Sequence, residues 1–248
     1  MMPEHRLWRI PARVLAKSQM LIEKAMRLAW PWAISFSGGK DSTVLLHLVR
    51  QINPHCKAYF IDSGAEFPET LQFVSETSNV LTVHPPMGIL DMYQEVGALG
   101  SEAVSPNTHW GPDDFLAMLI KVPSETINED KQWAGNFTGL RADESRSRKN
   151  MGQYKAQPWQ DSRGIWRCEP LMDWTERDIW AYIAQNNLPY NAVYDKYRSL
   201  GMPRTSWRVC TYAGRTSLAQ GRWVWLRKGW PQLWARFAQR FPEVRNYS

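Results

Sequence analysis

The stretch SFSGGKDSTVLLHL, residues 35–48, places two glycines and a lysine before a run of apolar residues. The segment AISF, residues 33–36, predicts a short buried strand, and the spacing of Val44, Leu45 and Leu48 predicts a helix after Lys40. Backbone N–H groups freed by glycines at the start of a helix form an anion site. The stretch therefore predicts a phosphate-binding loop within an α/β fold.

Each residue of the loop has a role that fits a bound phosphate. Gly38 and Gly39 allow the backbone to approach the ligand closely, and Lys40 can bridge phosphate oxygens. Ser37 and Ser42 can donate hydroxyl hydrogen bonds. The alternative is a structural turn that binds no ligand.

The loop differs from the Walker A pattern of nucleoside triphosphatases. That pattern requires a glycine five positions before Gly39, where this chain has Ile34, and a Ser or Thr after the lysine, where it has Asp41. These differences argue against an enzyme that cleaves the β–γ bond of ATP.

The following segments alternate between strand and helix patterns. Residues 57–62 and 79–84 predict strands, and helices are expected from Pro68 and over residues 89–96. Such alternation predicts a parallel sheet with right-handed crossovers. Ligands bind beyond the carboxyl ends of the strands in these sheets, where the loop and Asp62 fall.

The rest of the chain completes a Rossmann-like α/β fold. An amphipathic helix is predicted over residues 12–30, further strands over 133–141 and 164–171, and a helix capped by Thr175 and Asp178. Residues 100–131 are polar and irregular, as in a lid or an insertion. We expect a nucleotide-binding α/β domain at residues 1–195 and a helical region, rich in Trp and Arg, at 196–248 packed on it.

Charge is distributed unevenly along the chain. Residues 1–140 contain 11 basic and 15 acidic residues, whereas residues 141–248 contain 19 basic and 9 acidic residues. From Lys196 to Arg245 there are 11 basic residues and one acid, with tryptophans interleaved. This mixture favours a nucleic-acid partner, because arginines pair with phosphates and flat rings stack on bases. The alternative is a helical cap with tryptophans in its core and solvated arginines.

The composition excludes several classes of site. The chain has three widely spaced cysteines, which cannot supply the four thiolates of an iron–sulfur cluster and do not form a disulfide framework. No apolar run approaches the ~18 residues of a membrane span, and the N-terminal residues lack a signal-peptide pattern. We therefore expect a cytoplasmic protein that does not enter the membrane.

Four segments together resemble the PP-loop ATP pyrophosphatases, the adenine nucleotide α-hydrolase group, and within it the phosphoadenosine phosphosulfate (PAPS) reductase-like branch. They occur in the order of that group, which also adopts an α/β fold. They are SGGKDS (37–42), IDSGAEFPET (61–70), TGLRADESRSR (138–148) and EPLMDWTERDIWAYIAQNNLPYNAVYDKY (169–197).

The resemblance implies roles for individual residues. The loop would bind the phosphates of ATP or the equivalent anion of a sulfonucleotide, and Asp62 would lie near the nucleotide. Gly139, Arg141 and Arg148 fall in the segment that contacts phosphate or sulfate. A guanidinium fork matches such oxygens, although the segment could also be a solvated loop. Arg146 is a further candidate in that segment.

ATP-using members of the group cleave ATP between its α and β phosphates and transfer AMP to an acceptor. Lys40 and the arginines would stabilise the developing charge, with Mg²⁺ held by Asp41. Asp41 could instead cap the helix.

The cysteines distinguish the possible activities. PAPS reductases use a cysteine in a C-terminal motif, but no cysteine follows Cys210 here. The same branch includes the ATP pyrophosphatases of DNA phosphorothioation systems, whose need for DNA fits the basic C-terminal region. The resemblance therefore implies an ATP pyrophosphatase that activates an acceptor for sulfur insertion in DNA phosphorothioation, with DNA or another nucleic acid and a cysteine desulfurase as partners. The alternatives are a PAPS or adenosine phosphosulfate (APS) reductase-like enzyme and a catalytically silent nucleotide-binding subunit.

Cys210 is the candidate for sulfur chemistry in either active form. It is flanked by Arg204, Arg208 and Arg215, and nearby cations favour the thiolate. The alternative is a buried structural cysteine.

Overall fold

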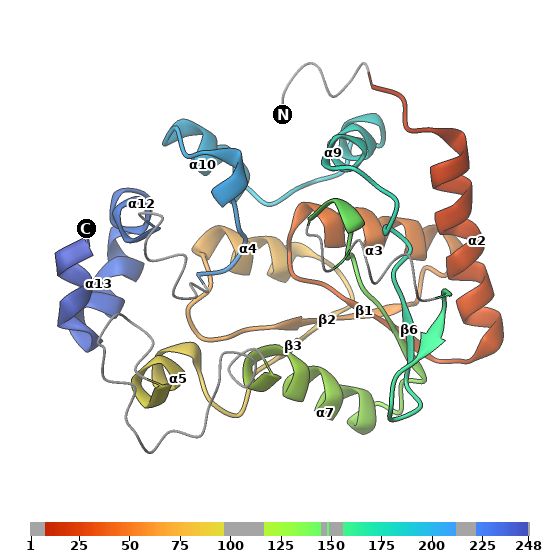
Figure 1. Cartoon of the computed structure of the whole chain (residues 1–248), viewed down its shortest axis with the longest axis horizontal. Helices are drawn as coiled ribbons and strands as arrows, with labels where there is room; N and C mark the ends of the chain where they lie inside the picture. Colours follow the sequence, from red (N-terminus) through yellow and green to blue (C-terminus); the bar gives the residue numbers. More distant parts are fainter. Residues whose placement is uncertain (1–7, 97–116, 145–147, 149–155, 212–221, 248) are drawn as a thin grey trace. The chain divides into compact units, whose positions relative to one another are not determined.

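In the computed structural model of the 248-residue chain, residues 8–96, 117–144, 148, 156–211 and 222–247 are described (Figure 1). Within them, one sheet has the strand order β3-β2-β1-β4-β6-β5. The predicted α/β fold with a mostly parallel sheet is confirmed. The strands are β1 (Trp32–Ser35), β2 (Lys57–Ile61), β3 (Val80–Val83), β4 (Gly135–Phe137), β5 (Trp159–Gln160) and β6 (Trp166–Cys168).

The helices alternate with the strands over the first half of the chain. The α-helices are α2 (Ala12–Leu28), α3 (Lys40–Ile52), α4 (Pro68–Glu76), α5 (Ile89–Val96), α7 (Val122–Asp130), α9 (Glu176–Gln185), α10 (Val193–Ser199), α12 (Arg222–Gly229) and α13 (Pro231–Arg240). A π-helical turn η1 (Ala117–Lys121) and the 3₁₀ segments η2 (Ala142–Glu144), η3 (Arg204–Ser206) and η4 (Pro242–Tyr247) complete the set. No described helix is long and apolar enough to cross a membrane.

Strand β1 is where the direction of sheet growth reverses. It pairs in parallel with β2 on one side, with Ile34 opposite Ala58, and with β4 on the other, with Ile34 opposite Phe137. Trp32, Ala33 and Ile34 are at most 1% exposed, as expected for a central strand covered on both faces. The loops after β1 and β4 leave neighbouring strands at this reversal, which is where α/β sheets bind ligands.

Local sequence signals account for several helix ends. Pro231 occupies the first turn of α13, where its missing N–H costs nothing. Thr175 and Asp178 form the predicted capping box of α9: the Thr175 side chain accepts from the Asp178 N–H, and the Asp178 carboxylate accepts from the Thr175 N–H at 2.9 Å.

Several elements were not predicted, helix α7, the turn η1 and strand β5 among them. Helix α7 and the turn η1 lie in the stretch 100–131 that was expected to be irregular, of which residues 100–116 are outside the described part. Helix α7 is mostly polar, and it buries Ser124 and Asn128 rather than an apolar stripe. The two-residue strand β5 pairs antiparallel with β6 and is too short for a periodic pattern.

The chain forms two compact units, each of which is described by itself. The first comprises residues 1–60, 73–81 and 127–191, and the second residues 61–72, 82–126 and 192–248. The basic C-terminal region thus belongs to the same unit as the motif segment 61–70. The boundary predicted at residue 195 stays a prediction.

Candidate functional site

The loop after β1 has the geometry of an anion site. Gly38 has φ of 69°, which favours glycine, and Gly39 is the N-cap of α3. The Gly39 carbonyl accepts from the hydroxyls of Ser42 at 3.0 Å and Thr43 at 2.9 Å, while the Gly39 N–H donates to Ser37 Oγ at 3.3 Å. These bonds hold the start of α3, whose positive end favours an anion.

Lys40, Asp41 and Arg141 form one charged cluster beside the loop. Lys40 Nζ lies 2.9 Å from Asp41 Oδ2, and Arg141 Nε donates to Asp41 Oδ1 at 2.5 Å. The side chains are 14%, 17% and 4% exposed respectively. Burial lowers the pKa of Arg141, but the charges of Asp41 and Glu144 outweigh this and raise it, so the guanidinium stays charged.

The segment after β4 approaches the loop closely. A Cβ on Gly139 would lie 3.2 Å from the Ser42 nitrogen and 3.3 Å from the Asp41 carbonyl carbon, so glycine fits where a larger residue would crowd the helix start. The structure therefore brings together Gly139, Arg141 and the loop, which come from separate segments and which the resemblance assigns to one nucleotide site. Whether they bind a nucleotide stays a prediction.

Arg148 and Arg146 are the other two arginines of the segment that the resemblance assigns to phosphate or sulfate. Arg148 pairs with Glu144, and its side chain is 38% exposed. Glu144 also accepts from the Arg141 backbone N–H at 3.1 Å, so Arg148 connects to the cluster through a shared carboxylate. Arg146 and Arg215 lie outside the described residues.

Asn191 was missed by the sequence analysis. Its amide Nδ2 donates to the Gly38 carbonyl at 3.1 Å, and the residue is 1% exposed. The bond holds the loop from a segment 153 positions later in the chain. Its position within the motif segment 169–197 was the only available signal.

A magnesium site at Asp41 can be tested against its neighbours. The two carboxylate oxygens accept from Lys40 and Arg141. Among the described residues, no group of three or more His, Cys, Asp or Glu is placed to hold a metal. Mg²⁺ is often held by one or two carboxylates together with substrate phosphates, so Asp41 fits such an ion only as a single protein ligand.

In the second unit, Asp62 directly follows β2 and shapes the motif segment. Asp62 Oδ1 accepts from the Gly64 N–H at 2.8 Å, and Asp62 Oδ2 lies 4.0 Å from His84 Nδ1. Glu66 is 7% exposed and accepts from the Ser63 hydroxyl at 2.6 Å. Burial raises the pKa of Glu66 to about 7, against the hydrogen bonds from Ser63, which lower it.

Cys210 is held against this motif segment from both sides. The Thr70 hydroxyl donates to the carbonyl of Val209 at 2.9 Å, and the Thr211 hydroxyl donates to the carbonyl of Ala65 at 2.5 Å. The residues immediately before and after the cysteine are therefore anchored to residues 65–70. All of these groups lie in the second unit.

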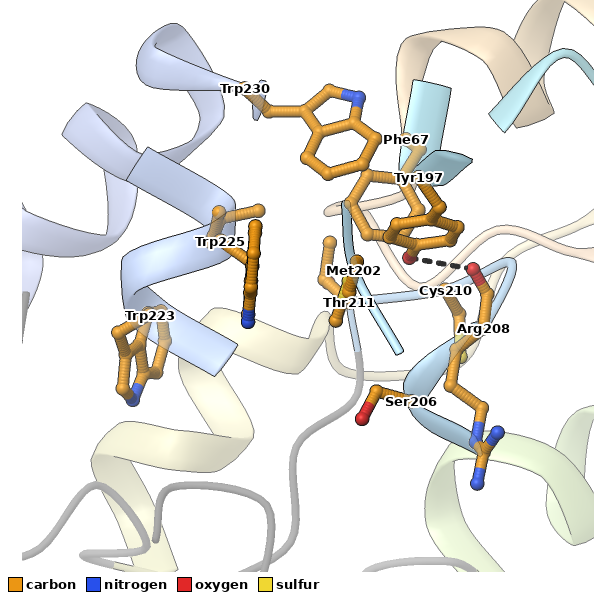
Figure 2. Close-up of a pocket in the computed structure, with 11 residues that line it drawn as sticks. Phe67, Tyr197, Met202, Ser206, Arg208, Cys210, Thr211, Trp223, Trp225 and Trp230 are labelled. Atoms are coloured by element: carbon orange, nitrogen blue, oxygen red, sulfur yellow. Dashed lines mark hydrogen bonds between the residues drawn. The ribbon is translucent and has the colours of Figure 1, made fainter. Parts of the chain in front are cut away.

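Cys210 also lines a small pocket within this unit (Figure 2). The Tyr197 hydroxyl donates to the Arg208 carbonyl at 2.8 Å beside it. The cavity volume of about 30 Å³ has room for about two waters and is too small for a nucleotide. Its wall consists of Phe67, Tyr197, Met202, Ser206, Arg208, Cys210, Thr211, Trp223, Trp225, Leu226 and Trp230.

The three cysteines differ in their surroundings. Cys56 and Cys168 are 0% exposed, and burial raises the pKa of both thiols, that of Cys56 to about 12. Cys210 is partly exposed. The thiolate is the reactive form of cysteine, so the geometry favours Cys210 over the other two for sulfur chemistry.

The C-terminal tryptophans are used largely inside the protein. Trp223 and Trp230 are 3% and 4% exposed, and the Trp230 indole N–H donates to Glu69 at 2.7 Å. Arg227 lies over Trp234 at 5.1 Å, and Lys228 lies over Trp225 at 5.3 Å. The nucleic-acid interpretation supposed that the tryptophans stack on bases. Trp223 and Trp230 are buried and are therefore not available for such stacking.

Comparisons with known proteins show which family this chain resembles. The model of the phosphoadenosine phosphosulfate reductase domain matches residues 31–206. An adenosine 5′-phosphosulfate reductase of Bacillus cereus is 30% identical over 185 residues, covering 73% of this chain and 72% of the relative. One from Bacillus mycoides is 30% identical over 201 residues, covering 78% of each.

A solved structure shows the same fold. The phosphoadenylyl-sulfate reductase of Candida auris, in a phosphate complex, matches with a TM-score of 0.51 and 18% identity. The match covers 76% of this chain and 93% of that one.

Proposed function

Because the chain belongs to the phosphoadenosine phosphosulfate reductase domain family, we propose that it binds an adenosine phosphosulfate nucleotide at Ser37–Ser42 and cleaves the phosphosulfate anhydride. The observation that carries the proposal is the convergence of Lys40, Asp41 and Arg141 on a glycine-rich helix start at the reversal of the sheet. The names of the 30%-identical relatives support the choice of nucleotide.

Lys40 and the start of α3 would neutralise the α-phosphate, which becomes the leaving group. Arg141, held by Asp41, would face the same anion or serve to position Lys40 through the shared carboxylate. Charge placed in advance at the leaving phosphate lowers the barrier, because no reorganisation is needed during the reaction.

We assign Cys210 as the nucleophile. Its thiolate would attack the sulfate sulfur, the sulfur–oxygen bond to the α-phosphate would break, and AMP or 3′-phospho-AMP would leave with that electron pair. Cys210 would then carry an S-sulfonate. Release of sulfite needs an external dithiol, whose first sulfur attacks Cys210 and whose second closes the disulfide. The two hydrogen bonds that anchor Val209 and Thr211 support this assignment.

The test incubates the protein with APS or PAPS without reductant, followed by intact-mass and peptide analysis. We expect the S-sulfonate on the Cys210 peptide with an equal amount of AMP or 3′-phospho-AMP. Cys210→Ser should bind the nucleotide but yield neither product, and Lys40→Ala should bind it weakly. An adduct on Cys56, or none on any cysteine, would contradict the assignment of Cys210.

A second candidate is the ATP pyrophosphatase, which would activate an acceptor for sulfur insertion, with DNA phosphorothioation as the specific process. The excess of basic residues after Lys196, which suits a nucleic-acid acceptor, favours it. In this case ATP would bind at the same loop with Mg²⁺, and a cysteine desulfurase would supply sulfur.

ATP labelled at the α phosphate separates the two candidates. Formation of AMP with equal pyrophosphate, and no reaction with APS or PAPS, would support the second. Formation of ADP would contradict both.

A further inference from the structure

The exposed charged side chains of the C-terminal helices are almost all cationic. We call this the basic face and define it by five exposed side chains on α12, α13 and η4. They are Arg227, Lys228, Arg236, Arg240 and Arg245. The only acid within residues 222–247 is Glu243, which is partly exposed. The exposed Gln232, Gln239 and Asn246 add neutral hydrogen-bonding groups between the cations.

The inner side of the same helices explains why the cations are displayed outward. Leu233, Phe237 and Ala238 of α13 are buried, and Phe237 lies against Trp223 of α12 with ring centroids 5.1 Å apart. This apolar contact orients both helices. The basic face therefore rests on a packed core rather than on isolated long side chains.

Two of the arginines surround an open hollow. A hollow of about 380 Å³ is lined by Leu90, Arg236, Gln239 and Arg240. Arg236 donates to the carbonyl of Gly64 at 3.0 Å, a contact that orients the guanidinium without neutralising it. Arg240 is partly balanced by Asp91 at 2.5 Å. Two guanidinium groups and an amide at one hollow match the oxygens of a phosphate group.

The chemistry of the face favours a nucleic acid over an acidic protein. Protein interfaces depend on apolar anchors that bury in pockets, whereas protein–DNA interfaces are more polar and positively charged. None of the large exposed apolar side chains among the described residues lies on α12, α13 or η4. We propose that the basic face binds the phosphate backbone of a nucleic acid.

The surroundings of the tryptophans predict which part of a nucleic acid the basic face contacts. Trp223 and Trp230 are buried, while Trp225 and Trp234 lie beside Lys228 and Arg227. These four tryptophan rings of α12 and α13 and the residue between the two helices thus pack against groups of the protein itself. Binding therefore proceeds through phosphates and is independent of base sequence.

The test measures the fluorescence anisotropy of labelled duplex DNA, single-stranded DNA and RNA of two unrelated sequences each, with the full-length protein. Four to five phosphate contacts on duplex DNA would give a log–log salt slope of about −4. The affinity should be the same within about twofold for the two sequences of each type.

Charge-matched variants locate the surface. Arg236→Gln with Arg240→Gln should weaken binding at least tenfold, as should Arg227→Gln with Lys228→Gln. Arg13→Gln with Arg27→Gln, on α2 in the first unit, removes the same charge and should change the affinity less than twofold. Thermal melts verify that each variant folds. Arg236 and Arg240 contact Gly64 and Asp91, so their double variant could lose stability. The Arg227/Lys228 variant then still tests the proposal.

An equal loss in the α2 control, or a flat salt response, would overturn the proposal. Equally tight binding of polyglutamate would instead identify an acidic protein as the partner. Because no nucleotide is added, the result does not depend on the proposed function.

Discussion

Arg141 Nε donates to Asp41 Oδ1 at 2.5 Å, and this bond connects the first turn of α3 to the segment after β4 across 100 positions of the chain. Because Asp41 also accepts from Lys40 at 2.9 Å, one carboxylate holds two cations beside the loop. The pair is therefore both a structural connection and a means of placing positive charge where an anion would bind.

Substitution of Lys40 should separate ligand binding from folding. Lys40→Ala removes one charge-assisted hydrogen bond to phosphate, which corresponds to about 10–100-fold weaker nucleotide binding. The melting temperature should fall only slightly, because Arg141 still pairs with Asp41. Calorimetric titration with APS, PAPS and ATP measures the loss of affinity. Lys131→Ala, at an exposed lysine, is the control. Unchanged affinity in Lys40→Ala would place the phosphate site elsewhere.

Removal of Arg141 should destabilise the protein. Arg141 is 4% exposed, so Arg141→Ala leaves the Asp41 charge with fewer partners in a poorly solvated place. Breaking a buried pair in this way costs about 3 kcal/mol. Arg148→Ala, at a side chain that is 38% exposed, should cost less than about 1 kcal/mol. Urea denaturation measures the free energy of unfolding of both variants. Equal losses would show that the burial of Arg141 does not increase its contribution to stability.

The buried carboxyl of Glu66 should make stability depend on pH. Its pKa rises from 4.5 in the unfolded chain to about 7 in the folded protein, so the folded state holds the proton more tightly. The associated stability is fully present below about pH 4.5 and is lost as pH rises through 7, by up to about 3 kcal/mol.

Glu66→Gln should remove this dependence, because an amide oxygen still accepts from Ser63 without becoming charged. Its melting temperature relative to the wild type should increase between pH 5 and pH 8. Glu95→Gln, at an exposed position, should run parallel to the wild type. A constant difference between Glu66→Gln and the wild type across this range would refute the assignment.

Alkylation should distinguish the cysteines in the folded state. Iodoacetamide reacts with the thiolate, and Cys56 and Cys168 are fully buried with raised thiol pKa. We expect peptide mapping to find the label on Cys210 first, and on all three only in denaturant. Cys210→Ser should then resist labelling while folded. Early labelling of Cys56 would show that its burial is transient.

Loss of the hydrogen bond between Thr211 and Ala65 should slow the reaction of Cys210 while costing the fold little stability. Thr211→Val removes the donor to Ala65, a bond whose net contribution is about 1 kcal/mol. The rate of S-sulfonate formation should fall at least tenfold if the position of the thiol matters, with nucleotide affinity retained. Thr205→Val, at an exposed site in the same region, provides the comparison. A rate equal to that of the wild type would show that the Thr211–Ala65 hydrogen bond does not position the Cys210 thiol.

The sequence by itself determined the elements that depend on neighbouring residues. The loop at 37–42, the start of α4 at Pro68, the capping box of Thr175 and Asp178, and the helix over 89–96 all follow from local spacing. The order of strands and helices further implied a parallel sheet, because crossovers between parallel strands have one preferred hand.

Only the tertiary structure decided which distant groups meet. The bonds from Arg141 to Asp41, from Asn191 to Gly38 and from Thr211 to Ala65 join positions at least 100 residues apart, which no local pattern encodes. It also decided that Trp223 and Trp230 are buried rather than exposed, and that the polar segment of α7 is helical. Periodicity reports which side of an element is apolar, whereas burial and hydrogen bonding depend on what packs against that side.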